Sequence, residues 1–313
     1  MSDLLSYDFM QRALLAALLV GITAPSVGIY LVQRRQALMG DGIGHVALTG
    51  VGLGLLFQTS PVWMAVAVCV VAAVIMELVR SRGNQRGDIA LAMLFYGGMA
   101  CGRLLISKSP AASGTSGSLD SYLWGSILAV DASDLVTIAV LGAVVIAVTI
   151  GLRRQLFAVC QDEEFARVTG LPVRLLNLLL AVMAAVTVTV AMRVVGLLLV
   201  SALMVVPVAA AQLLTRSFRA TQVLAIGIGV LVSLGGVVTS YQADVPPGSA
   251  IVLLAIACFA VFSALAAPLA RRRHRGVAAG AAEAADSEGR IPVQQAAEQS
   301  LPAESVKGAG LAQ

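Results

Sequence analysis

Apolar stretches of about 20 residues recur along most of this chain, and no other feature of the sequence restricts its fold as strongly. Each stretch can cross a hydrocarbon layer of about 30 Å as a helix, because a helix rises about 1.5 Å per residue. Only 12% of the residues are charged and 58% are hydrophobic, whereas soluble domains carry roughly a quarter charged residues. We therefore predict an all-α, polytopic integral membrane bundle with about eight to nine transmembrane helices.

The positions of the apolar stretches give nine candidate crossings. Boundaries are least distinct between Arg174 and Leu214, where Arg193 is the only charge near the middle. Two tightly turned helices, or one long helix with a re-entrant piece, would both suit this part of the chain. The predicted crossings are Phe9–Val32, Ile43–Phe57, Val62–Val79, Asp88–Ile106, Asp134–Leu152, Arg174–Met192, Val194–Leu214, Thr221–Ser240 and Ser249–Ala267.

Arginine residues gather in alternate loops between these crossings. The positive-inside rule places such loops in the cytoplasm and the arginine-poor loops, rich in Ser, Gly and Pro, outside. With nine crossings, the amino terminus is predicted to lie outside and the carboxyl terminus in the cytoplasm. The cytoplasmic arginines are Arg34, Arg35, Arg80, Arg82, Arg86, Arg153, Arg154, Arg167, Arg216, Arg219 and Arg271–Arg273, and the outward loops are Gln58–Pro61, Lys108–Asp131 and Tyr241–Gly248.

The composition changes after Arg275, where Ala, Glu, Gly, Gln and Ser replace the large apolar residues. Such a segment buries too little apolar surface to offset its ordering entropy. We predict a transmembrane domain over residues 1–270, which would form the permease if the chain transports a solute, and a basic, then low-complexity, disordered cytoplasmic tail over residues 271–313. The formal charge of +4 comes from arginine clusters that suit membrane orientation, so no nucleic-acid partner is indicated.

Asp41 and His45 are the residues that most suggest chemistry, since they lie four residues apart in a Gly-rich apolar segment. On a helix their side chains share one face, and ionisable groups within a membrane span mark an ion or proton path by default. Imidazole suits zinc, copper, iron and nickel, and carboxylate extends the range to manganese. Two ligands make a loose metal site, which a second copy of the chain would complete across a two-fold axis.

Both residues also suit structural roles. Asp41 would cap a helix that begins near Ile43, and His45, the only histidine in the apolar part of the chain, would be a buried packing residue. The glycines of this segment predict close helix packing through small-x-x-x-small spacings, and they do not form a dinucleotide motif, which needs a preceding strand. They include Gly40, Gly44, Gly50 and Gly54.

The longest predicted cytoplasmic loop contains a second candidate site. Its acidic start, helix-compatible middle and Gly-x-Pro stop predict a short helix outside the bilayer, either solvated or docked on a cytoplasmic partner through Phe165 and Val168. No phosphate-binding G-x-x-x-x-G-K-S/T motif occurs, so the chain is not predicted to be an enzyme and any driving ATP binds to another subunit. The residues of this candidate site are Asp162, Glu163, Glu164, Phe165, Ala166, Arg167 and Gly170.

Five segments, in this order, resemble the membrane permeases of bacterial zinc and manganese ABC importers. They read GDGIGHVAL, SLDSYLWGS, DEEFARVTGLP, VGLLLVSALMVVP and SYQADVPPG and begin at Gly40, Ser118, Asp162, Val195 and Ser240. The resemblance implies the ABC importer permease fold, a permease homodimer, two cytoplasmic ATPase subunits and an extracytoplasmic metal-binding protein. It also implies that Asp41 and His45 line the translocation path and that Asp162–Gly170 is the ATPase-coupling helix.

Zinc is the predicted cargo ahead of manganese or iron, because the pair offers no thiolate and the Irving–Williams order ranks zinc above manganese. No permanently bound cofactor is predicted. Two other functions stay open. A proton-coupled secondary metal transporter would use Asp41 and His45 as a relay and would not need the docking helix. An intramembrane enzyme would use Ser126 or Ser201 with His45, or Asp41 as an aspartyl protease.

Overall fold

The computed structural model of the protein describes residues 7–81, 86–109, 121–126, 128 and 130–265. Contacts between residues group Met1–Ser263 into one compact unit. The tail predicted over residues 271–313 lies outside the described residues. Within the described ranges the regular structure is helical and contains no strand, which confirms the all-α prediction.

Eight of the described helices are long and apolar enough to cross a membrane. Each corresponds to a predicted crossing, and all ends except the start of α2 agree with the prediction within three residues. They are α1 (Asp8–Gln33), α2 (Met39–Leu56), α3 (Pro61–Arg80), α4 (Arg86–Lys108), α6 (Ala132–Gly151), α9 (Val173–Val195), α11 (Phe218–Ala243) and the helix Pro247–Leu265. The shorter helices are α7 (Arg153–Gln161), α8 (Glu163–Val168) and α10 (Val200–Leu214).

The ninth predicted crossing, Val194–Leu214, contains the short helix α10 of 15 residues. At about 1.5 Å per residue, α10 is about 22 Å long, shorter than the hydrocarbon core of about 30 Å. It begins six residues later than predicted because Gly196, at φ 85°, ends α9 and the next residues form a turn. Of the two arrangements that suited this stretch, the structure has two separate helices.

Helix α2 begins at Met39, four residues before the predicted start at Ile43. Glycine is a poor helix former, so a Gly-rich segment predicts a late start. Contacts with other helices reverse this preference: a Cβ at Gly40 would lie 3.3 Å from Ser201 Cβ, and one at Gly42 would lie 2.5 Å from a methyl carbon of Leu91. The absence of side chains at these positions lets α2 approach its neighbours from its first turn onward.

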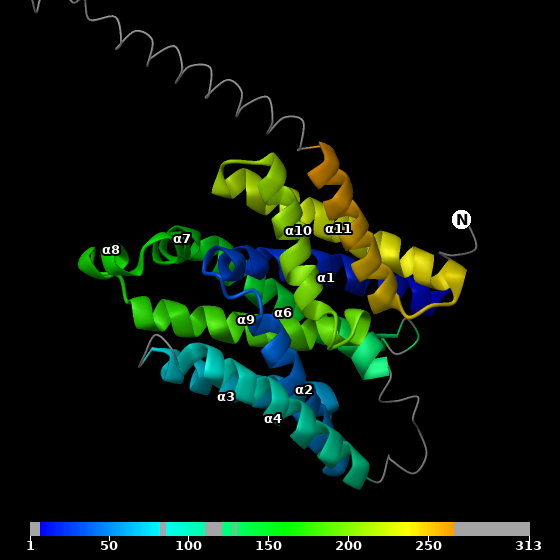
Figure 1. Cartoon of the computed structure of the whole chain (residues 1–313). Helices are drawn as coiled ribbons and strands as arrows, with labels where there is room; N and C mark the ends of the chain where they lie inside the picture. Colours follow the sequence, from blue (N-terminus) through cyan, green and yellow to red (C-terminus); the bar gives the residue numbers. More distant parts are fainter. Residues whose placement is uncertain (1–6, 82–85, 110–120, 127, 129, 266–313) are drawn as a thin grey trace, which may run out of the picture. The chain divides into compact units, whose positions relative to one another are not determined.

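Burial separates the central helices of the unit from the peripheral ones. In each of α1, α2 and α9, 72% of the most apolar window is buried, compared with 17% in α4 and 28% in α6. Figure 1 shows α2 between the pair α3 and α4 and the helices α9 and α10, and α2 contacts all four. Helix α2, which carries Asp41 and His45, therefore lies in the interior, while α4 and α6 leave apolar faces open.

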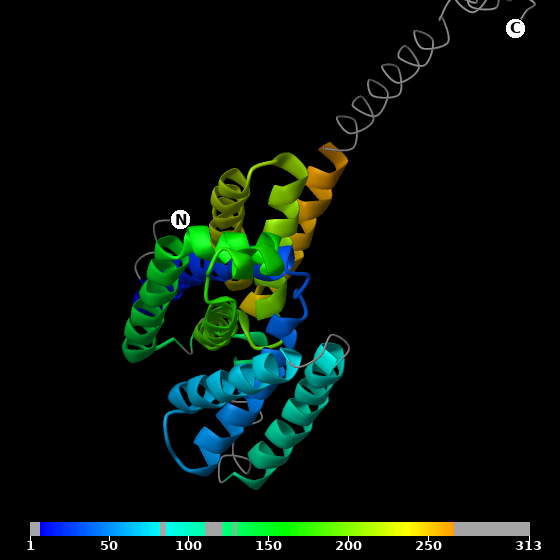
Figure 2. The same cartoon turned by 90° about the vertical axis from the view of Figure 1, so that its left-hand side faces the viewer.

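The predicted cytoplasmic and outward segments lie at different sites in the unit. Arg34, Arg80 and Arg167, from separate predicted cytoplasmic segments, line one cavity. Figures 1 and 2 show α7 and α8 together beside the end of α1. Phe9, near the amino terminus, lines a second cavity together with residues of the outward segments. This separation agrees with the orientation predicted from arginine.

Candidate functional site

Asp41 lies in the first turn of α2, where the helix dipole favours a carboxylate. Its Oδ1 atom accepts a 3.0 Å hydrogen bond from the hydroxyl group of Ser201, the second residue of α10. The N-cap position of α2 is Leu38, and no side chain caps the helix. The capping role considered for Asp41 is therefore wrong, because the helix starts earlier and the carboxylate bonds to a different helix.

His45 is buried beside α4, with 9% of its surface exposed. The centroid of its ring lies 4.0 Å from that of Phe95, and the two planes are inclined by 60°. A Cβ at Gly98 would lie 2.8 Å from the carbonyl carbon of His45, so α4 approaches the α2 backbone closely at this point. The imidazole is thus held on the face of α2 that packs against α4.

Glycines also hold α2 close to two other parts of the fold. A Cβ at Gly44 would lie 2.8 Å from the carbonyl oxygen of Leu197, in the turn before α10. A Cβ at Gly54 would lie 2.6 Å from the Cα atom of Pro61, at the start of α3. These contacts confirm the close packing predicted for the Gly-rich segment. They fix the position of Asp41 and His45 relative to α3, α4 and α10.

The candidate pair stands without a larger cluster of ligands. Among the residues that the structure describes, no group of three or more His, Cys, Asp or Glu side chains could hold a metal ion. The hydroxyl group of Ser201 donates to Asp41, and no hydrogen bond within the described ranges joins it to His45. In the described residues, Ser201 and His45 therefore lack the hydrogen bond that a serine–histidine hydrolase requires.

Three of the segments that carry the family resemblance meet beside the start of α10. The N–H groups of Leu197 and Leu198 donate to the carbonyl groups of Tyr122 and Leu123, over 2.9 and 3.3 Å. Gly248, from the last segment, packs so closely on the backbone of the other two that a Cβ would not fit. The turn before α10, which precedes the Asp41-bonded residue Ser201, is thus held in place by two of the predicted outward segments.

A shielded ion pair stabilises the same region. Arg193 Nη2 lies 2.7 Å from Asp134 Oδ2, and the two side chains are 17% and 12% exposed. The guanidinium carbon of Arg193 lies 5.1 Å from the centroid of the Tyr122 ring, a cation–π distance. Arg193, which in the sequence is an isolated charge between two apolar stretches, therefore joins the end of α9 to the start of α6.

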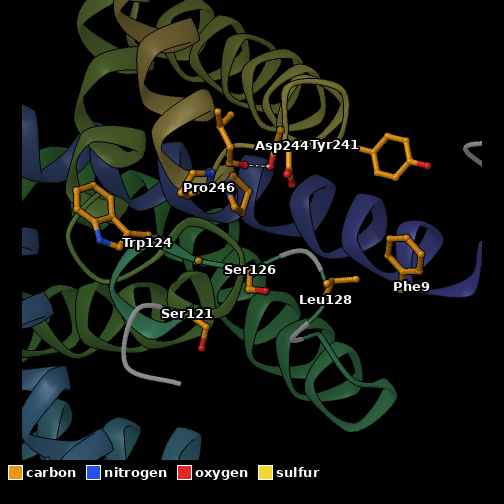
Figure 3. Close-up of a pocket in the computed structure, with 12 residues that line it drawn as sticks. Phe9, Ser121, Trp124, Ser126, Leu128, Tyr241, Asp244 and Pro246 are labelled. Atoms are coloured by element: carbon orange, nitrogen blue, oxygen red, sulfur yellow. Dashed lines mark hydrogen bonds between the residues drawn. The ribbon is translucent and has the colours of Figure 1, made fainter. Parts of the chain in front are cut away.

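The outward segments line a cavity of about 750 Å³, shown in Figure 3. Aromatic side chains of Phe9, Trp124 and Tyr241 contribute to its wall, and Asp244 is the only charged residue among those that line it. Neither Asp41 nor His45 belongs to this lining. The cavity is therefore separate from the candidate ion site.

Helix α8 has the local structure that its sequence predicts. The Oδ1 atom of Asp162, at the N-cap, accepts hydrogen bonds from the N–H groups of Glu164 and Phe165 over 2.9 and 3.0 Å. Gly170 follows the helix at φ 82°, a conformation that glycine adopts without a steric penalty. These end signals confirm the short helix between the acidic start and the Gly-x-Pro stop.

The side chains of α8 divide between an open face and an anchored face. Phe165 and Val168 are 64% and 86% exposed, whereas Ala166 is fully buried. Exposed large apolar side chains on a short helix outside the spans suit insertion into a groove on another protein. The open face is therefore the face predicted for docking, and the buried face attaches α8 to the bundle.

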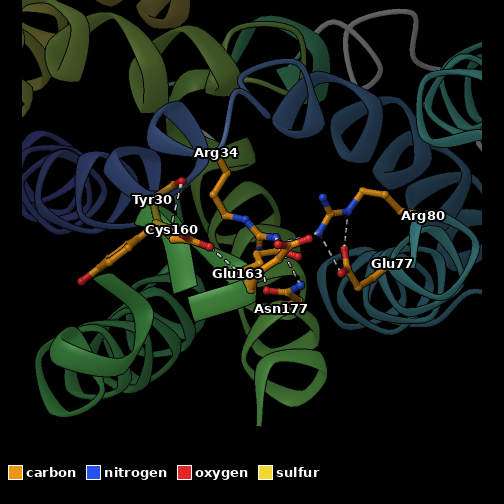
Figure 4. A network of polar contacts seen from close by, with 9 residues as sticks. Tyr30, Arg34, Glu77, Arg80, Cys160, Glu163 and Asn177 are labelled. Carbon is orange, nitrogen blue, oxygen red and sulfur yellow. Dashed lines mark hydrogen bonds and ion pairs between the residues drawn. The ribbon is translucent and has the colours of Figure 1, made fainter. Parts of the chain in front are cut away.

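Glu163 belongs to the anchored face and forms a polar network, shown in Figure 4. Its carboxylate pairs with Arg34, which follows α1, and lies 4.0 Å from Arg80 Nη2, at the end of α3. Asn177 of α9 donates to Glu163 Oε1 over 3.2 Å and accepts from Arg34 Nη1 over 2.7 Å. Arg80 also pairs with Glu77 over 2.9 Å. Sequence analysis did not predict this network; its only signal was the presence of Glu77 and Asn177 inside apolar spans.

Burial and neighbouring charges shift the pKa values of two groups in this region. Burial lowers the pKa of Arg34, Arg80 lowers it further, and Glu163 raises it. The guanidinium group stays charged in proteins, so the network keeps its ion pairs. Burial raises the pKa of the Cys160 thiol to about 11; Arg34 counteracts this rise and Glu163 adds to it. Cys160 is therefore a protonated, unreactive thiol at neutral pH.

Comparison with known proteins supports the resemblance that the segments carry. The model of the ABC 3 transport family matches residues 6–266. The chain is 34% identical over 259 residues to the "Manganese transport system membrane protein MntC" of Halalkalibacterium halodurans, covering 83% of this chain and 88% of that protein. It is 32% identical over 257 residues to a "Probable iron transport system membrane protein" of Haemophilus influenzae, covering 82% and 93%.

A solved structure agrees with these matches. The fold is similar to that of a chain in PsaBC from Streptococcus pneumoniae in complex with Fab, at 30% identity and a TM-score of 0.75, covering 83% of this chain and 93% of that chain. The family match over most of the sequence, the eight apolar helices and this structural likeness all agree. The chain therefore belongs to the ABC 3 transport family, as a multi-pass metal ABC transporter permease of the cell membrane.

Proposed function

We propose that this permease imports a divalent transition metal into the cytoplasm and that Asp41 and His45 contact the ion in transit. The observation that carries the proposal is the position of this pair inside α2, where Asp41 is bonded to α10 and His45 packs against α4. Ionisable side chains in an apolar span are costly and face a pathway or a partner by default. A carboxylate and an imidazole one turn apart supply two ligands that a divalent transition metal accepts.

A site with two protein ligands suits transport, because conduction requires an ion to be bound weakly enough to leave. A second copy of the chain would supply another Asp41 and His45 and complete four-coordination across a two-fold axis. The sparsely buried helices α4 and α6 offer apolar faces for such contacts or for lipid. The proposed permease is therefore a homodimer with a shared ion site.

The driving force comes from two cytoplasmic ATPase subunits. The sequence has no phosphate-binding motif of its own, and α8 exposes Phe165 and Val168 outside the spans. We assign Asp162–Gly170 as the coupling helix that docks on the ATPase, by the helix-in-groove mode. An extracytoplasmic metal-binding protein delivers the ion to the opposite side.

Manganese and zinc are the two candidate cargoes. Zinc is favoured by the Irving–Williams order at a site of imidazole and carboxylate. Manganese is named for relatives such as MntC of Halalkalibacterium halodurans and ScaB of Streptococcus parasanguinis, and iron for the Haemophilus influenzae protein. Because selectivity in cells depends more on geometry, ligand type and metal supply than on affinity, we place manganese first and zinc second.

Uptake by proteoliposomes that contain the permease, its ATPase and its binding protein tests this function. Radiolabelled manganese or zinc should accumulate only when ATP is supplied, and collapse of the proton gradient by an ionophore should not stop it. Uptake of both metals is then compared in competition. Accumulation that needs no ATPase and follows the proton gradient would support a proton-coupled secondary transporter instead.

A further inference from the structure

We propose that Glu163 is a positioning residue that connects α8 to the transmembrane bundle and transmits movement of α8 to the start of α2, which carries Asp41. The proposal rests on the function proposed for α8 as coupling helix. It separates two roles within one short helix: Phe165 and Val168 face the partner, and Glu163 faces the spans.

The connection begins with one carboxylate that three other elements share. Arg34, Arg80 and Asn177 come from the residue after α1, the end of α3 and the interior of α9, and all three contact Glu163. The Arg34 side chain is only 5% exposed. The Glu163 side chain is 39% exposed, so the pair is buried only on the arginine side, where loss of the carboxylate would leave the Arg34 charge shielded from water without this counterion. The position of Arg34 is thus linked to that of Glu163.

Arg34 is joined to α2 by a tight turn. The N–H group of Gln36 donates to the carbonyl of Leu31 over 2.8 Å, and that of Met39 donates to the carbonyl of Gln36 over 3.0 Å. Arg35 lies at φ 58°, a conformation that is uncommon for residues other than glycine. Because this turn is hydrogen-bonded to both α1 and α2, it is short and constrained. A displacement of Arg34 should therefore also displace the start of α2. Asp41 lies in the first turn of that helix.

Glu163 is also linked to α2 through helix α3. Arg80 lies 4.0 Å from Glu163 and pairs with Glu77, one turn earlier in the same helix. Helix α3 packs on α2 through the contacts of Gly50 and Gly54. The turn after α1 and helix α3, which both contact α2, are therefore linked to the same carboxylate.

Space for movement lies beside the network. A cavity of about 680 Å³ is lined by residues of α8, of the turn before α2 and of the end of α3, including Arg167, Leu38 and Met76. Because this volume is not filled by side chains, α8 and the turn can shift together without immediate overlap.

The test measures how many metal ions are imported per ATP hydrolysed by the permease, reconstituted with its ATPase and binding protein. Glu163→Gln preserves size and removes the charge. We expect it to retain ATPase binding and ATP hydrolysis but to import at least tenfold fewer ions per ATP. Glu163→Asp keeps the charge and should recover part of this loss. Asp8→Asn removes an exposed carboxylate in the first turn of α1, outside both the network and the docking helix; it is the control and should keep the wild-type ratio.

An unchanged ratio in Glu163→Gln would overturn the proposal, and so would a parallel fall in transport and ATP hydrolysis, which a purely structural role produces. If the Glu163→Gln permease does not reach normal abundance in the membrane, Asn177→Ala is measured instead. Fewer ions imported per ATP in Asn177→Ala supports the proposed network, and a wild-type number overturns the proposal. Phe165→Ala separates this proposal from the docking function. Loss of ATPase binding in Phe165→Ala with a normal ratio in Glu163→Gln refutes only the network, whereas full binding by Phe165→Ala refutes docking by α8.

Discussion

Replacing Gly44 with alanine tests how tightly α2 is held beside the turn before α10. The new Cβ would lie 2.8 Å from the carbonyl oxygen of Leu197, 0.6 Å inside the 3.4 Å limit of ordinary contact. That oxygen belongs to a turn anchored on Tyr122 and Leu123, so it cannot rotate away as a side chain would. Overpacking of this kind costs about 1–3 kcal/mol, and the better helix propensity of alanine offsets up to about 1 kcal/mol. We expect a net destabilisation of about 1–2 kcal/mol.

Gly227→Ala, in α11, is the matched control, because no heavy atom lies within 4 Å of its added Cβ. Only the propensity term acts there, so this variant should be as stable as wild type or more stable, by up to about 1 kcal/mol. The assay is equilibrium unfolding of the purified permease in mixed micelles of sodium dodecyl sulfate and a mild detergent. Equal stability of Gly44→Ala and Gly227→Ala would refute the close packing of α2 on the turn.

Two further predictions concern residues outside α2. Asp134→Asn should lower the free energy of unfolding by about 3–5 kcal/mol because it leaves Arg193 shielded from water without its counterion. Adding Arg193→Met to this variant should restore much of the lost stability. A loss of less than about 1 kcal/mol in Asp134→Asn alone would contradict the burial of this pair. Because burial raises the pKa of Cys160 from 9.0 to about 11, the thiolate fraction at pH 8 should be about 100-fold lower in the folded protein than in the unfolded one. Maleimide labelling of a variant with Cys160 as its only cysteine should be slower by that factor and should accelerate as pH rises toward 11; equal rates before and after unfolding would disprove the shift.

The eight long helices were predictable because each needs only a local signal, an apolar stretch of sufficient length. The short helix α8 was also predictable, since Asp162 and Gly170 mark its ends in the sequence. Local signals failed at the start of α2, where Gly40 and Gly42 disfavour a helix by propensity but permit it by packing. They failed again at Val194, because the turn at Gly196 depends on hydrogen bonds to Tyr122 and Leu123.

Contacts between distant residues account for what the sequence did not reveal about the candidate sites. Asp41 and Ser201 are 160 residues apart, and Arg34 and Glu163 are 129 apart. Nothing in the local pattern around Glu163 distinguishes it from Glu164, although one faces the spans and the other is exposed. The acidic start, the helix-compatible middle and the Gly-x-Pro stop predicted a functional segment here, and only the fold places the two carboxylates in different surroundings.

The role of Asp41 and His45 is tested most directly by radiolabelled metal uptake, with permease abundance quantified in the same membranes. A site with so few ligands has none to spare, so Asp41→Ala and His45→Ala should each abolish uptake at near-normal abundance. His45→Gln keeps polarity and bulk but ligates metal weakly, so it should match His45→Ala if the imidazole contacts the ion. A packing role predicts the reverse, with His45→Gln close to wild type. Wild-type uptake by a well-expressed Asp41→Ala permease would contradict the assignment of this pair to the ion pathway.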